Sequence, residues 1–132
     1  MRVHVRDQAA EFRRLGDRYD AHWTPMILLL DPSGEERHRV EGFLPVEELL
    51  PQLELGLGRM AFSRGDFADA ERRFRRVVEN APGAEAAPEA LYWAGVARYK
   101  ATNDAEALKA TAAAFHDRYQ QSTWAKKASI WD

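Results

Sequence analysis

The sequence contains no cysteine. Disulfides, thiolate nucleophiles, iron–sulfur ligation and cysteine-based zinc sites are therefore all excluded for these residues. A chain of this composition cannot carry out thiol–disulfide exchange on its own.

Long hydrophobic runs and an excess of charge of one sign are also lacking. The longest apolar run, residues 26–30, is far shorter than the roughly 20 residues that cross a bilayer. The formal net charge of −2 gives no overall attraction to nucleic acid or to an anionic membrane. The N-terminal residues show neither an apolar segment nor a small-residue cleavage site, so no secretory signal is expected. These features predict a cytoplasmic protein without a membrane partner.

Motifs for catalysis and cofactor binding are absent as well. There is no nucleophile elbow, phosphate loop or dinucleotide fingerprint. The histidines lie far apart in the chain and form no metal-binding pair on one helix face; they are His4, His22, His38 and His116. The sequence predicts no catalytic residue, no cofactor and no metal site.

The first third of the chain predicts a small α+β unit. Residues 2–6 alternate polar and apolar, which is typical of a strand with one covered face. Apolar residues at helical spacing predict a helix over residues 8–20, with Asp7 as its cap. The run 26–30 has the length of a strand covered on both faces, and residues 31–34 form a turn. The more polar residues 36–43 predict an edge strand.

The rest of the chain predicts helices. Apolar stripes separated by glycine, proline and asparagine indicate helices over residues 52–64, 67–80, 88–101, 104–119 and 122–131. A helix is also predicted from Pro45, and Pro51 should either kink it or start a new helix. The predicted fold class is α+β, with domains at residues 1–52 and 53–132.

The helical part resembles the tetratricopeptide repeat family. The residues that carry the resemblance have the spacing of small and aromatic positions in that motif; they are Leu57, Gly58, Gly65, Phe67, Ala70, Phe74 and Pro82. Residues 89–119 are similar through Trp93, Gly95, Tyr99, Ala107 and Leu108, although the closing proline is replaced near Gln120. The resemblance implies an array of helical hairpins.

Residues 2–55 resemble the C-terminal portion of a thioredoxin-like domain. Thr24-Pro25 before the apolar strand matches the family's cis-proline loop, and Gly42 matches the glycine after its hairpin. The resemblance implies an incomplete β-α-β-β-α unit without the strand and the Cys-x-x-C helix that precede it in the family. Because the missing strand is central, we predict either a homodimer that completes its sheet in trans or a chain truncated before Met1.

Two surfaces are candidates for binding a protein or peptide. The resemblance to thioredoxin-like domains suggests the loop Trp23, Thr24 and Pro25, which in that family can pair with an extended peptide. The helical repeats suggest a groove lined by first-helix side chains, namely Leu55, Arg59, Phe62, Tyr92, Val96 and Tyr99. The alternative explanation is that Trp23 covers the sheet edge and that several groove residues are core, since two repeats barely bury their own core.

The predicted function is non-catalytic protein–protein interaction, with a peptide, a helix or a second copy of the chain as partner. One alternative is a fragment of a thioredoxin-like oxidoreductase whose Cys-x-x-C precedes Met1. Another is nucleic-acid binding through Arg72, Arg73, Arg75 and Arg76. We favour a solvated helix face for these arginines, because glutamates lie among them and the net charge is negative; no nucleic-acid partner is expected.

Overall fold

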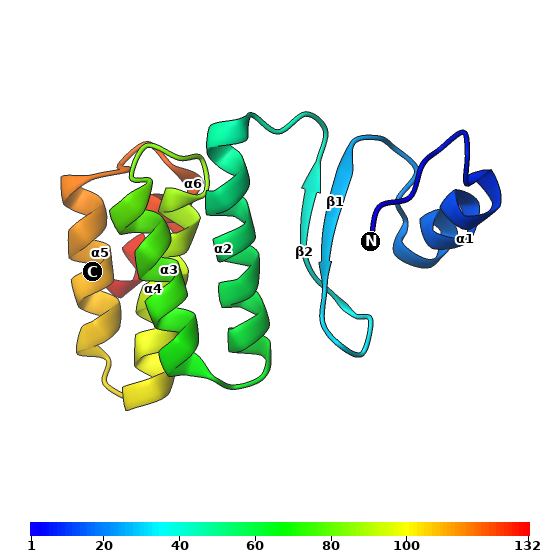
Figure 1. The fold of residues 1–132 in the computed structure, drawn as a ribbon. Coiled ribbons are helices and arrows are strands. Elements are labelled where there is room, and N and C mark those ends of the chain that lie inside the picture. The colour runs from blue at the N-terminus through cyan, green and yellow to red at the C-terminus, as the bar shows by residue number, and fades with distance from the viewer. The chain divides into compact units, whose positions relative to one another are not determined.

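The computed structural model describes residues 1–132 and divides into two compact units, Met1–Leu44 and Pro45–Asp132. The first contains one helix and a two-stranded sheet, and the second is entirely helical (Figure 1). The boundary predicted between residues 52 and 53 lies inside a continuous helix, α2 (Val46–Ser63).

The first unit consists of α1 (Ala9–Tyr19), β1 (Met26–Leu30) and β2 (Glu36–Glu41). The strands form an antiparallel hairpin in which Met26 pairs with Glu41 and Leu29 with His38, with an irregularity at Leu29/Leu30. The end of α1 is held to the hairpin by polar contacts, because the Tyr19 hydroxyl donates to the carbonyl of Gly34 at 2.9 Å. The predicted helix, hairpin and turn are therefore confirmed.

The hairpin turn is organised by the carboxylate of Asp31. This carboxylate accepts hydrogen bonds from the backbone N–H groups of Ser33 and Glu35, and from the guanidinium of Arg37 at 2.8 and 2.9 Å. Gly34 has a φ of +86°, which a residue with a side chain rarely adopts. The hydroxyl of Ser33 and then the guanidinium of Arg37 hold the pKa of Asp31 well below its usual range.

We expect acid to loosen this turn only at very low pH. The pKa of Asp31 is lowered in the folded state, so the ionised carboxylate stabilises the turn. This stabilisation is complete above the unfolded-state pKa and is lost as the pH falls through the folded-state pKa. Amide NMR spectra should show a turn that stays ordered at the ordinary carboxyl pKa of about 4 and disorders only at a much lower pH. Asp31→Asn should disorder the turn at every pH, whereas the exposed-site control Asp17→Asn should leave it intact. An ordered turn in Asp31→Asn would contradict this account.

Three expectations for the first unit were wrong. Residues 2–6 form no strand, because a strand requires a neighbouring strand and the backbone of His4 instead bonds with Gln8 at the entrance to α1. Asp7 does not cap α1; Gln8 occupies the cap position, and its side chain accepts no hydrogen bond from the first turn of the helix. The side chains of β1 are half-buried or exposed instead of being covered on both faces, because the sheet has only two strands.

The helical unit contains α2, α3 (Phe67–Asn80), α4 (Ala87–Thr102), α5 (Glu106–Asp117), α6 (Thr123–Ala128) and the 3-10 turn η1 (Ser129–Trp131). Each helix packs on the next, and α4 also contacts α2 and α6. The helices therefore form two layers, with α2, α4 and α6 in one and α3 and α5 in the other. Figure 1 shows the alternating directions of α2 to α5.

The helix ends follow the local signals in the sequence. Asp66 caps α3 by accepting from the N–H of Asp69, and Ser122 caps α6 by accepting from the N–H of Ala125. Asn103 ends α4 in the left-handed conformation, with φ of 56°. α2 contains Pro51 but does not restart there, so the predicted second start is absent.

The core of the second unit depends on small residues where helices cross. A side chain on Gly58 of α2 would meet the ring of Phe74 of α3, and one on Gly95 of α4 would meet Thr111 of α5. Phe74 and Leu55 are the largest fully buried side chains, and most other core residues are alanines. Small residues allow these helices to approach closely, and the core ties the two layers together.

Candidate functional site

A continuous row of aromatic rings crosses the layer made by α2, α4 and the C-terminal segment. We call this row, with the cationic side chains stacked on it, the aromatic face. The row begins with Phe67 at the start of α3 and continues through Phe62, Trp93 and Tyr92, and both Trp124 and Trp131 contact Tyr92; the centroid separations are 4.8 to 5.6 Å. Such contacts stabilise aromatic pairs beyond their burial alone.

Tyr92 is the centre of this face. Its ring contacts Trp93 on the same helix, Trp124 on α6 and Trp131 in η1, the last in a stacked arrangement with the centroids 4.8 Å apart. The rings are half-buried, since they pack on the core while keeping part of their surface in solvent. The face therefore joins three successive helices of one layer and remains accessible from outside.

Three cationic side chains lie over the rings of the aromatic face. Arg59 lies 5.5 Å from the centroid of Trp93, Lys100 lies 6.0 Å from Phe67, and Lys127 lies 3.9 Å from Trp124. Arg59 also forms an ion pair of 3.1 Å with Glu89. The face thus combines apolar area with positive charge.

The structure places the predicted groove residues in three different settings. Arg59, Phe62 and Tyr92 belong to the aromatic face. Leu55 is fully buried in the core, as the packing explanation required. Val96 and Tyr99 are half-buried on α4 and take no part in the ring contacts described above.

Sequence reasoning did not assign four residues of this face to the site. Trp93 and Phe67 were interpreted as repeat-motif positions, and Trp124 and Trp131 lie in the last segment, whose register was not fixed. A signal was present nevertheless, because three of the four tryptophans fall in the helical unit and two of them are seven residues apart.

The loop residues Trp23, Thr24 and Pro25 lie in the first unit and are exposed. Trp23 is 77% exposed, so it makes little contact with the sheet edge. The Thr24–Pro25 peptide bond is cis. The carbonyl of Pro25 accepts from the N–H of Gly42, which closes the base of the hairpin.

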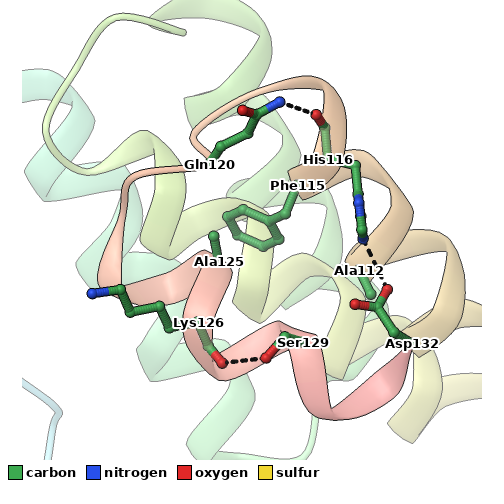
Figure 2. Close-up of a pocket in the computed structure, with 8 residues that line it drawn as sticks. All are labelled: Ala112, Phe115, His116, Gln120, Ala125, Lys126, Ser129 and Asp132. Carbon is green, nitrogen blue, oxygen red and sulfur yellow. Dashed lines mark hydrogen bonds and ion pairs between the residues drawn. The ribbon is translucent and has the colours of Figure 1, made fainter.

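A hollow of about 480 Å³ lies between α5 and the C-terminal segment (Figure 2). Its polar rim groups bond to one another. His116 pairs with Asp132 at 3.0 Å, Gln120 donates to the carbonyl of His116, and Ser129 donates to that of Lys126. Apart from the ammonium group of Lys126, these groups already have partners, so the hollow offers a ligand few free donors.

The arginines of α3 all have acidic partners. Arg72 and Arg73 pair with Asp69, Arg73 and Arg76 also contact Glu54, and Arg75 pairs with Glu71 at 2.7 Å. The hydrogen bond from Arg73 lowers the pKa of Asp69. This compensation of charge supports the interpretation of these arginines as a solvated helix face.

Metal-binding and membrane-spanning features are absent from the fold. No group of three or more His, Asp and Glu side chains could hold a metal ion. None of the helices is both long enough and apolar enough to pass through a bilayer.

Comparison with known proteins identifies one segment. The tetratricopeptide repeat family model matches residues 89–122, which include most of α4 and all of α5. No curated protein and no solved structure matches the chain. The helical unit therefore contains a tetratricopeptide-like repeat region, whereas the thioredoxin-like resemblance of residues 2–55 stays a prediction.

Proposed function

We propose that this chain is a non-catalytic protein–protein interaction module and that its aromatic face is the binding surface. The observation that carries the proposal is the continuous row of half-exposed rings across α2, α4 and the C-terminal segment. Repeats of the tetratricopeptide type generally bind protein partners, and the matched segment includes Tyr92 and Trp93 at the centre of the row. Stacked repeats present such an extended surface on one layer of helices.

The composition of the face supports a binding role. Tyrosine, tryptophan and arginine dominate the energetically important positions of protein interfaces, because they offer a large contact area with few rotatable bonds. The ring of Phe74, by contrast, is fully buried in the core. The rings of the aromatic face keep part of their surface exposed, which leaves area for a partner.

Selection of displayed random peptides on the full chain tests this proposal. We expect the enriched peptides to bind wild-type protein and to lose about tenfold in affinity for Tyr92→Ala, because that change removes the central ring. Arg59→Gln is a second variant, with a milder effect on packing. Ile130→Ala, at a 79%-exposed apolar residue outside the row, is the control and should bind normally.

Circular dichroism shows whether each variant keeps its helices. Equal binding by folded Tyr92→Ala and Arg59→Gln would contradict the proposal, as would a failure of any peptide to enrich on the wild-type chain. Light scattering over a concentration series then decides whether a second copy of the chain is itself a partner. A mass that stays monomeric would restrict the proposal to other proteins.

A further inference from the structure

The aromatic face carries positive charge that the protein itself does not neutralise. Each of the helices α2, α4 and α6 contributes one cation that lies over a ring; these cations are Arg59, Lys100 and Lys127. No carboxylate lies within ion-pair distance of Lys100 or Lys127, in contrast to Lys109 of α5, which pairs with Glu106 at 2.7 Å. The layer that carries the rings therefore also carries unpaired ammonium groups.

Two buried hydrogen-bond donors at the centre of the face lack acceptors. The Nε of Arg59 and the Nε1 of Trp93 are shielded from solvent and have no partner. Buried N–H groups without an acceptor are uncommon in folded proteins, and each one calls for an explanation. Since the guanidinium of Arg59 lies over the ring of Trp93, both donors belong to one place on the face.

Glu89 supplies an acceptor to only part of the Arg59 guanidinium. Its carboxylate contacts Nη2 of Arg59 at 3.1 Å and leaves the Nε of Arg59 without an acceptor. Glu89 lies on the same helix as Trp93, one turn before it, so it reaches the guanidinium from the side. A carboxylate supplied from outside would reach the part of the Arg59 guanidinium that is exposed to solvent.

We propose that the aromatic face binds an extended acidic peptide segment of a partner protein, and that a partner carboxylate replaces Glu89 on Arg59. This inference rests on the proposed function and names the class of partner. Further carboxylates of the segment would meet Lys100 and Lys127, while its apolar side chains lie on the rings.

Charge complementarity favours an acidic partner. The three cations of the face outnumber the one carboxylate, Glu89, that lies among them. The face is therefore positive, although the formal net charge of the whole chain is −2. Neighbouring helices lie about 8–10 Å apart, so the path from α2 to α6 is roughly 20 Å. About six residues of extended peptide cover that distance. A short acidic segment with apolar residues between its carboxylates therefore fits the face.

Single-stranded nucleic acid also combines negative charge with stacking bases, and it is the competing class. The peptide is favoured because the face carries a single cation from each of three helices and no continuous basic track along which a phosphate backbone could run. In addition, the arginines of α3 are already paired with carboxylates and add no basic track.

The test compares fluorescent peptides that share Leu and Phe anchors and differ only in the residues between them. One peptide has Asp and Glu at these positions, the second Asn and Gln, and the third Lys. Anisotropy with the full chain should show the acidic peptide binding about tenfold tighter than its amide counterpart, with a difference that shrinks in high salt. A labelled oligothymidine is measured alongside.

Charge-removing variants should change the affinity for the acidic peptide in opposite directions, which a loss of packing alone would not produce. Lys100→Gln and Lys127→Gln should each weaken the acidic peptide about threefold, with little effect on the amide peptide. Glu89→Gln should strengthen it, because the competing carboxylate is removed from Arg59. Lys126→Gln is the matched control, since Lys126 lines the hollow beside α5 and carries a charge next to Lys127 in the chain.

The outcomes distinguish a failure of the acidic-peptide inference from a failure of the proposed binding function. Tighter binding of the amide or lysine peptide, or weaker acidic binding in Glu89→Gln, would overturn the inference and leave the proposed function standing. Tighter binding of the oligothymidine would overturn it in favour of nucleic acid. If the peptide selection enriches nothing, the proposed function itself fails.

Discussion

Phe74→Ala should destabilise the helical unit by about 3–5 kcal/mol, the largest effect that we expect from a single side-chain truncation. Phe74 is fully buried on α3, and its ring lies directly over Gly58 of α2. Truncation removes the apolar contacts of the ring and leaves a cavity between two helices that glycine cannot fill. Since whole domains are stable by roughly 5–15 kcal/mol, this loss approaches the total for a small unit.

Urea denaturation followed by circular dichroism measures this change, because most of the helix lies in the second unit. Phe67→Ala is the matched control. Phe67 lies on the same helix but is only half-buried at the edge of the aromatic face, so its truncation should cost clearly less. Equal losses for the two variants would show that Phe74 is not central to the core.

Gly95→Ala should destabilise the unit by about 3 kcal/mol, although alanine is normally the better helix former by about 1 kcal/mol. The opposite sign arises because a Cβ atom on Gly95 would lie 2.0 Å from Oγ1 of Thr111 and 2.7 Å from its Cβ. Thr111 is itself buried and donates to the carbonyl of Ala107, so it has little freedom to move away. α4 and α5 would have to separate.

The control for this variant is Gly83→Ala, at a glycine whose added Cβ would meet nothing within 4 Å. We expect a change of at most about 0.5 kcal/mol there. The double variant Gly95→Ala with Thr111→Ala should recover part of the loss, because the closest atom is removed. A gain of stability in Gly95→Ala alone would contradict the close crossing of α4 and α5.

The helices were predictable because their signals are local. The stripe of Ala70, Phe74 and Val77 has helical spacing, and Asp66 at the cap defined the start of α3. The prediction of a strand at residues 2–6 was wrong because strand formation is not local. Alternation of apolar residues is a local pattern, whereas a strand exists only where another strand supplies hydrogen bonds, and the sheet here has two strands.

The repeat pattern indicated part of the aromatic face, whose role in binding stays a proposal. It identified Arg59, Phe62 and Tyr92, because first-helix positions recur at a fixed distance from Gly58 and Gly95. It did not identify the contribution of Trp124 and Trp131, since their contacts with Tyr92 join segments more than thirty residues apart in the sequence. Such contacts depend on the path of the chain after α5, which no short motif describes.

The family match falls on the segment that has fewer of the recognisable motif residues. More motif residues were found before Pro82, yet the tetratricopeptide model matches residues 89–122. In that segment the helices approach through small residues such as Ala94, Gly95 and Ala107, all of which are buried. Small buried residues determine helix packing as strongly as aromatic ones do, but they stand out less in a sequence.

The indole N–H resonances of the tryptophans test the central claim most directly. Proton–nitrogen NMR spectra of the full chain, titrated with the selected acidic peptide, report on all four indoles at once. The account predicts shifts for Trp93, Trp124 and Trp131, whose rings belong to the aromatic face, with Trp23 unchanged. Shifts confined to Trp23, or peptide binding that leaves all four indoles unchanged, would contradict the aromatic face as the binding surface.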